Sequence, residues 1–246
     1  MAKTLILIPS RMAATRLPGK PLLKINNLSI ISHVFKRAEE TNIGEVVVAT
    51  EDQKVFEDVK KNGGKAIITH KSHKTGTDRI FEAYKKLDVK DVDYILNLQG
   101  DEPNINKDDI INLYNQMISN NSEIGTLAAK IQNEEMLNNE NAVKVITETK
   151  LDKDSFPTAL NFCRKISLKI NKNIYHHIGI YLFRTSVLEN FVRLEQTKNE
   201  IDNRLEQLRA LDNNLKINVA LAKSSPIGVD TQEDYLAIKK IMEYKS

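Results

Sequence analysis

The chain has 246 residues, of which 41% are hydrophobic and 28% charged, and its net charge is +3. These values are ordinary for a soluble globular protein, and the single cysteine, Cys163, excludes an internal disulfide and suits a reducing compartment. The N-terminal apolar run is too short for a signal peptide, and no window approaches the roughly 18 apolar residues of a membrane helix. These features together predict a cytoplasmic protein that does not bind a membrane. The sequence has no stripe of basic residues interleaved with aromatic ones, so we do not expect it to bind nucleic acid.

Buried strands alternate with helices in the first hundred residues. Continuous apolar runs predict the strands, and apolar residues at helical spacing, preceded by capping residues such as Ser29 and Asp52, predict the helices between them. In chain order these are a strand at 4–9, a helix from 30 to about 41, a strand at 45–49, a helix after 52, a strand at 65–69, a helix at 77–87 and a strand at 93–98. This alternation indicates an α/β fold with a mostly parallel central sheet and helices on both faces.

The second half of the chain is less regular. We expect strands at 125–131, 142–147, 177–183 and 216–222, and helices at 106–120, 185–194 and 200–211 and at the C-terminus. Residues 148–175 are largely polar, and no linker or repeat marks a boundary. The sequence therefore predicts a single domain over 1–246, with a less regular region at about 148–215.

The loop after the first strand carries Arg11, Arg16 and Lys20 and no acidic residue. In a parallel sheet, ligands bind outside the carboxyl ends of the strands, which selects this loop together with residues 69–77 and 99–104. The loop lacks the glycines of a Walker motif or a dinucleotide fingerprint. A solvated basic turn is the plain alternative, but the position favours an anion site whose cations are not paired with protein carboxylates.

Two acidic segments could complete such a site. Asp101 follows a buried strand in LNLQGDEP, and Asp230 precedes a capping box formed by Thr231 and Asp234 in GVDTQED. An acidic turn that caps the next helix is the alternative for the first segment, although Asn106 can supply that cap. Carboxylate oxygens suit Mg²⁺, so the two aspartates are candidate ligands of one metal ion.

Three further features have plain structural interpretations. The segment KTGTDR offers Thr75 or Thr77 as the cap of a helix whose free N–H groups can bind acceptors. His176 and His177 are adjacent on a strand, so they point to opposite faces and are a poor metal pair. Glu206 and Arg209 have the spacing of a surface ion pair on a helix.

Taken together, IPSRMAATRLPGKPL, LNLQGDEP and GVDTQED resemble the signatures of the 3-deoxy-manno-octulosonate (Kdo) cytidylyltransferase family. The segments HKTGTDR, NAVKV, HHIGIYLFR and LEQLR also match, in the family's order, and the resemblance runs from about residue 4 to 240. It implies a nucleotide-diphospho-sugar transferase (Rossmann-like) fold and the reaction CTP + Kdo → CMP-Kdo + diphosphate in lipopolysaccharide biosynthesis. It also implies a Mg²⁺-dependent enzyme and a homodimer, with the sugar pocket and the dimer contacts in the less regular region at about 148–215.

The resemblance also implies roles for particular residues. Lys20, Asp101 and Asp230 would be catalytic, and the two aspartates would hold Mg²⁺. The nucleotide would be bound by Arg11, Thr15, Arg16, Lys20, Thr75, Gly76, Thr77, Arg79 and Gln99. Kdo would be bound by Arg164, His177, Tyr181, Glu206 and Gln207.

Two segments depart from the family pattern. Ala14 stands where the family usually has serine, and KISLK follows Arg164 where the family typically has ATIPW. Two alternatives therefore stay open: a non-catalytic nucleotide-binding module of the same fold, and a cytidylyltransferase for another sugar acid.

Overall fold

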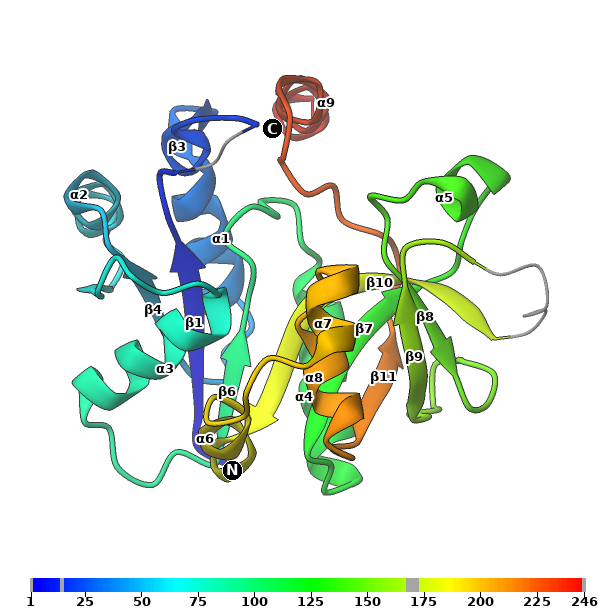
Figure 1. Ribbon diagram of the computed structural model, residues 1–246. Helices are drawn as coiled ribbons and strands as arrows, with labels where there is room; N and C mark the ends of the chain where they lie inside the picture. Colours follow the sequence, from blue (N-terminus) through cyan, green and yellow to red (C-terminus); the bar gives the residue numbers. More distant parts are fainter. Residues whose placement is uncertain (1, 14–15, 167–172, 245–246) are drawn as a thin grey trace. The chain divides into compact units, whose positions relative to one another are not determined.

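A computed structural model of the protein describes residues 2–13, 16–166 and 173–244 (Figure 1). The chain forms two compact units, one of Met1–Asp108 with Pro226–Ser246 and the other of Asp109–Ser225. The predicted α/β class is confirmed. The single domain over 1–246 stays a prediction, and residues 148–215 lie wholly in the second unit. No helix in the described part of the chain is long and apolar enough to cross a membrane.

The first unit contains a fully parallel sheet in the order β6-β1-β4-β5. Its strands are β1 (Thr4–Ser10), β4 (Glu45–Thr50), β5 (Ala66–Ile68) and β6 (Tyr94–Asn97). The side chains of Leu5, Ile6, Leu7 and Ile8 in β1 are buried, as the continuous apolar run predicts for a central strand covered on both faces.

Helices cover both faces of this sheet. Right-handed crossovers from β1 to β4 and from β4 to β5 carry α1 (Ile30–Glu39) and α2 (Gln53–Lys61) on one face. The return from β5 to β6 places α3 (Gly76–Leu87) on the other, in front of β1 in Figure 1. Ser29 and Asp52 cap α1 and α2 as predicted, and Thr75 caps α3.

A short hairpin in the first unit was not predicted. It consists of β2 (Lys24–Ile25) and β3 (Leu28–Ser29), joined by Asn26 and Asn27, both with positive φ, as tight hairpin turns require. The C-terminal helix α9 (Gln232–Glu243) begins with the predicted Thr231–Asp234 capping box. Apolar residues of the hairpin, α1, α9 and the loops that precede η1 and α9 form one cluster: Leu17, Ile25, Ile30, Val229 and Ile238.

The second unit is built on a curled, mostly antiparallel sheet in the order β11-β7-β10-β8-β9. The strands are β7 (Ile124–Ala129), β8 (Lys144–Thr147), β9 (Ala159–Cys163), β10 (Ile174–Arg184) and β11 (Ile217–Leu221). Thr158 bridges to Asn218, so the chain entering β9 reaches β11 on the far side of the sheet. The remaining helices are α4 (Lys107–Ser119), α5 (Glu134–Asn138), α6 (Thr185–Phe191), α7 (Lys198–Asn203) and α8 (Gln207–Asp212).

The continuous helix predicted at 200–211 is wrong. A capping box of Thr197 and Glu200 begins α7 earlier than expected, and Arg204 ends it with φ 53° in the left-handed region. The buried side chain of Leu205 follows, and α8 starts at Gln207. Ile201, Leu205 and Leu208 keep helical spacing across the break, so the apolar pattern did not reveal it.

Candidate active site

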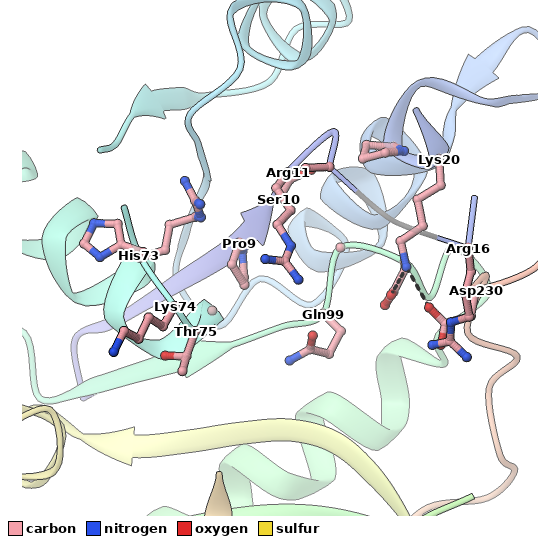
Figure 2. Close-up of a pocket in the computed structure, with 16 residues that line it drawn as sticks. Pro9, Ser10, Arg11, Arg16, Lys20, His73, Lys74, Thr75, Gln99 and Asp230 are labelled. Atoms are coloured by element: carbon pink, nitrogen blue, oxygen red, sulfur yellow. Dashed lines mark hydrogen bonds and ion pairs between the residues drawn. The ribbon is translucent and has the colours of Figure 1, made fainter. Parts of the chain in front are cut away.

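A polar pocket of about 350 Å³ lies at the carboxyl edge of the parallel sheet, within the first unit. Its walls come from the loops after β1, β5 and β6 and from Asp230, so all three loops selected from the sequence contribute (Figure 2). The predicted residues that line it are Arg11, Arg16, Lys20, Thr75, Gly76, Arg79, Gln99, Asp101 and Asp230. Thr77 is not among the lining residues, and its hydroxyl accepts a hydrogen bond from Asn97. Thr15 lies outside the described residues.

The shape of the first loop explains where Lys20 points. Gly19 has φ +75°, in the left-handed region that glycine adopts at no steric cost, and its N–H donates to the carbonyl of Met12 at 3.3 Å. The turn leads into the short 3₁₀ helix η1 (Lys20–Leu22), with Pro21 in its first turn. Lys20 therefore leaves a fixed turn and extends into the pocket.

Lys20 joins the two predicted metal ligands. Its Nζ lies 2.6 Å from Asp101 Oδ2 and 3.0 Å from Asp230 Oδ1, and donates to the carbonyl of Val229 at 2.9 Å. Figure 2 shows the ammonium directed at Asp230. Burial lowers the pKa of Lys20, but the two carboxylates outweigh it, and the net pKa is raised above 10.5.

The expectation that these cations have no protein carboxylate as a partner is wrong for Lys20 and Arg16. Arg16 Nη2 pairs with Asp230 Oδ2 at 2.9 Å, and both side chains are about half exposed. The partners stand 81 to 214 residues away in the chain, so the local sequence could not reveal them. For Arg11, the expectation holds in the part of the chain that the structure describes.

The pair Asp101 and Asp230 suits a hard cation. Both carboxylates place an oxygen within 3.0 Å of one point, Lys20 Nζ, and oxygen is the ligand type that Mg²⁺ prefers. Among the described residues, no group of three or more His, Cys, Asp or Glu side chains could hold a metal. A Mg²⁺ ion here would therefore complete its shell with water or substrate oxygens, as Mg²⁺ usually does.

Glu102 is a third carboxyl group beside this pair. Its Oε2 is buried and has no hydrogen-bond partner in the described part of the chain. Burial, with the negative charges of Asp101 and Asp230, raises the pKa of Glu102 to about 8. The sequence placed Glu102 in the acidic segment but gave no sign that its side chain turns inward.

The loop between β5 and α3 approaches β1 closely. A Cβ on Gly76 would lie 3.1 Å from Cγ of Pro9, and a Cβ on Gly100 would lie 2.9 Å from the Pro9 carbonyl oxygen. Both glycines therefore let their loops reach the end of β1. Arg79 braces the start of the loop, because its guanidinium donates to Thr69 Oγ1 at 2.7 Å and pairs with Glu51.

His73 and Lys74 also line the pocket, although no role was predicted for them. Both stand in the loop 69–77 that the sheet rule had selected, so their position was available from the sequence. The orientation of His73 was not, because it depends on a bond to Glu82 of α3.

Two of the residues predicted to bind the sugar lie on β10 in the second unit. The rings of His177 and Tyr181 are 5.5 Å apart. Thr126 Oγ1 donates to the carbonyl of Ile180 at 2.7 Å, so it accepts from His177 Nε2 at 3.0 Å, which indicates a neutral ring protonated at Nε2. Burial and the neighbouring His176 lower the pKa of His177 to about 3.

Tyr181 and Glu206 form the polar part of the same region. The hydroxyl of Tyr181 is buried and has no hydrogen-bond partner within the described residues. Burial, together with the negative charge of Glu206, raises the pKa of Tyr181. A buried hydroxyl of this kind is suited to a polar ligand.

The predicted pair of Glu206 and Arg209 is present, but its expected place on the surface is wrong, because the Arg209 side chain is buried. Arg209 donates to both carboxylate oxygens of Glu200, at 2.8 and 2.6 Å, and both of these side chains are 4% exposed. Its guanidinium also lies over the ring of Phe191, 4.8 Å from the centroid, while Glu206 is 3.5 Å away. Arg209 therefore joins α7 to α8 inside the unit, next to Glu206 and Gln207.

Arg164 is held by backbone carbonyl groups. Its guanidinium donates to the carbonyls of Glu140, Asn203 and Arg204 at 3.2 to 3.3 Å, and the ammonium of Lys144 donates to the carbonyl of Arg164. Arg164 thus ties the end of β9 to the junction between α7 and α8. Its predicted role in binding the sugar stays a prediction, and residues 167–169 of the KISLK segment lie outside the described residues.

Known proteins that are similar to this chain define the class to which it belongs. A model of the family described as cytidylyltransferase matches residues 5–217. A 3-deoxy-manno-octulosonate cytidylyltransferase of Rhodopseudomonas palustris (strain BisB18) is 42% identical over 98% of each chain. One of Thermodesulfovibrio yellowstonii is 42% identical over 97% of this chain and 98% of the relative.

A solved structure adds a match in three dimensions. A CMP:2-keto-3-deoxy-manno-octonic acid synthetase complexed with CTP has a TM-score of 0.91, with 35% identity and complete coverage of both chains. The protein belongs to the 3-deoxy-manno-octulosonate cytidylyltransferase family.

Proposed function

We propose that the protein transfers the cytidylyl group of CTP to Kdo, which yields CMP-Kdo and diphosphate for lipopolysaccharide biosynthesis. The observation that carries the proposal is one pocket at the carboxyl edge of a parallel sheet, in which the three cationic side chains of the loop after β1 lie with two converging carboxylates. The names of the relatives, and the solved synthetase complexed with CTP, support the choice of both substrates.

The chemistry requires positioning and charge more than a reactive side chain. A hydroxyl oxygen of the sugar acid attacks the α-phosphorus, a new P–O bond forms, and the bond to the bridging oxygen of the diphosphate breaks. Arg11, Arg16 and Lys20 would bind the triphosphate and stabilise the charge on the departing diphosphate. Such a transfer needs no enzyme nucleophile.

Asp101 and Asp230 would hold Mg²⁺ in this reaction. When bound, the ion polarises the phosphate and acidifies the attacking hydroxyl. The oxygen donors and their convergence on Lys20 support this assignment. The Lys20 ammonium already neutralises part of the charge of the two carboxylates, so it competes with a cation for the same oxygens.

The remaining predicted residues would bind the cytidine part of CTP and the sugar acid. Thr75 and Gly76, with Thr77 behind them, would lie against the cytosine, Arg79 would brace their loop, and Gln99 would face the nucleotide. The sugar acid would contact the residues predicted for it in the second unit: Arg164, His177, Tyr181, Glu206 and Gln207. The buried hydroxyl of Tyr181 supports a polar ligand there.

The test is an assay of diphosphate release with purified protein, Mg²⁺, each of the four nucleoside triphosphates and a panel of sugar acids. We expect release with CTP and Kdo and little with other pairs. Release with a different sugar acid would correct the substrate. Calorimetric binding of CTP without release with any acceptor would instead identify a non-catalytic nucleotide-binding module.

We also propose that the protein is a cytoplasmic homodimer. Family resemblance implies the dimer, and Leu160, which is 59% exposed on the edge strand β9, supplies apolar surface of the kind that dimers cover. Light scattering should give twice the chain mass of 28.0 kDa. A mass equal to one chain at micromolar concentration would contradict the dimer.

A further inference from the structure

Glu82, on α3, is bonded to the loop that precedes its own helix. Its Oε2 accepts from the backbone N–H of His70 at 2.9 Å and from Nε2 of His73. Its Oε1 pairs with Lys86, one turn further along α3, at 2.6 Å. The side chains of Glu82 and His73 are only about 20% exposed. One carboxylate thus fastens two points of a loop to a rigid helix.

The negative charge of Glu82 strengthens its hydrogen bonds to the loop. Burial raises the pKa of Glu82, but the hydrogen bonds from His73, Lys86 and the His70 N–H outweigh it and lower the pKa to about 2. The carboxylate is therefore ionised at any working pH. Hydrogen bonds to an ionised acceptor are shorter and stronger than neutral ones.

The fastened loop forms one side of the pocket. His73, Lys74 and Thr75 all line it, and Figure 2 shows them on the side opposite to Lys20 and Asp230. The cations and carboxylates that would hold the triphosphate and metal are on the Lys20 side. Glu82 thus holds the loop that forms the side of the pocket opposite to these cations and carboxylates.

We propose that Glu82 is a positioning residue for the nucleoside part of CTP, which acts by holding His73 and the loop to Thr75 against α3. This inference rests on the proposed function, because it assumes that CTP occupies the pocket. Glu82 does not itself line the pocket, so it acts through the loop. Its loss should weaken the contact with the nucleoside and leave the triphosphate contacts unchanged.

The substitution Glu82→Gln keeps the size of the side chain and removes its charge. At saturating Kdo we expect the KM for CTP to rise about tenfold, with kcat within about threefold of the wild type, as when a binding contact is lost. The preference for CTP over UTP should fall. Tripolyphosphate, which has no nucleoside, should inhibit the variant and the wild type equally.

A matched control is Glu57→Gln, a glutamate on α2 bonded only to Gln53 in the described part of the chain. It should change none of these constants. Equal weakening of CTP and tripolyphosphate in Glu82→Gln, or no change in either, would overturn the inference.

A second variant covers the case in which Glu82→Gln fails to fold. His73→Ala removes the side chain that bonds to Glu82. We therefore expect the same rise in the KM for CTP, with tripolyphosphate inhibition unchanged. An unchanged KM would overturn the inference. Where both fold, the double variant should be no worse than the worse single variant. Multiplication of the two effects would show independent roles and overturn it.

Assays of the wild type and of Glu82→Gln distinguish a failure of the proposed function from a failure of the proposed role of Glu82. A wild type that releases no diphosphate from CTP and Kdo refutes the proposed function. A wild type that turns over normally, beside a Glu82→Gln variant with an unchanged KM for CTP, refutes only the role of Glu82.

Discussion

Lys20 brings one ammonium group into contact with the carboxylates of Asp101 and Asp230, and its side chain is only 14% exposed. Because the ammonium is largely buried, it offsets part of the repulsion between Asp101 and the half-exposed Asp230. The same ammonium occupies the oxygens that a divalent cation would need. In the proposed reaction, the binding of metal and the binding of the triphosphate would therefore be linked through one side chain.

The substitution Lys20→Met should separate these two effects. We expect the free protein to bind Mn²⁺ more tightly than the wild type, because the competing ammonium is gone, and to bind CTP more weakly, because a charged hydrogen bond contributes roughly 1.5–3 kcal/mol. Titration of Mn²⁺ by electron paramagnetic resonance and calorimetry with CTP measure both. Lys65→Met, in an exposed pair with Glu45, is the control. Weaker or unchanged Mn²⁺ binding in Lys20→Met would contradict the competition.

The lowered pKa of His177 makes the stability of the folded protein depend on pH. Its pKa is about 3 in the folded protein against an ordinary value of 6.5, because burial disfavours the charged ring. Between these values the unfolded chain binds a proton that the folded protein does not, so stability falls as the pH is lowered from about 6.5 towards 3. The slope from this group is at most about 1.4 kcal/mol per pH unit.

Urea unfolding at pH 7 and pH 4.5 tests this linkage. The wild type should lose more stability between these pH values than His177→Gln, because the glutamine side chain at position 177 does not titrate. Equal losses in the two proteins would show that His177 is not the group responsible.

The ion pair of Glu200 and Arg209 connects the helices α7 and α8. Both side chains are almost fully buried, and Arg209 also lies over Phe191. Removing one member of a buried pair leaves the other charge without compensation, which typically costs about 3–5 kcal/mol. These helices flank Glu206 and Gln207, so the pair also fixes that segment.

Arg209→Met should therefore lower the free energy of unfolding by about 3 kcal/mol. Arg37→Met, which breaks an exposed pair with Glu40 on α1, should cost about 0–1 kcal/mol. Chemical denaturation measures both. The double variant Glu200→Gln with Arg209→Met should recover part of the loss, and a double variant less stable than Arg209→Met alone would contradict the assignment.

Elements with a strong local signal were predicted correctly. The continuous apolar run of β1 and the caps Ser29 and Asp52 depend on neighbouring residues, so the sequence displays them directly. The hairpin β2–β3 was missed, because strands of two residues carry no periodicity. The break at Arg204 was missed because a left-handed backbone at an arginine has no pattern in the sequence.

The site was predicted in outline for one general reason. Parallel strands bring their carboxyl ends to one edge, so the loops after β1, β5 and β6 had to meet there. Which side chains touch was not predictable, because Lys20 meets its carboxylates across 81 and 210 residues of chain. Glu82 was missed because at the sequence level it looks like any helix glutamate four residues from a lysine.

At the scale of the whole molecule, the cytidylyl transfer that we propose requires one pocket to combine triphosphate binding with a metal-binding carboxylate pair. Asp101 belongs to both functions, because it touches Lys20 and is a proposed ligand of Mg²⁺. Replacing it with asparagine keeps the shape of the side chain and removes its charge.

Diphosphate release from CTP, Kdo and Mg²⁺ by Asp101→Asn is the most direct measurement. We predict a kcat at least about 100-fold below that of the wild type, with cooperative unfolding retained, since metal-assisted charge stabilisation contributes several kcal/mol. Asp88→Asn, an exposed aspartate paired with Lys90, should act like the wild type. A kcat for Asp101→Asn within a few fold of the wild type would contradict the metal-assisted transfer at this pocket.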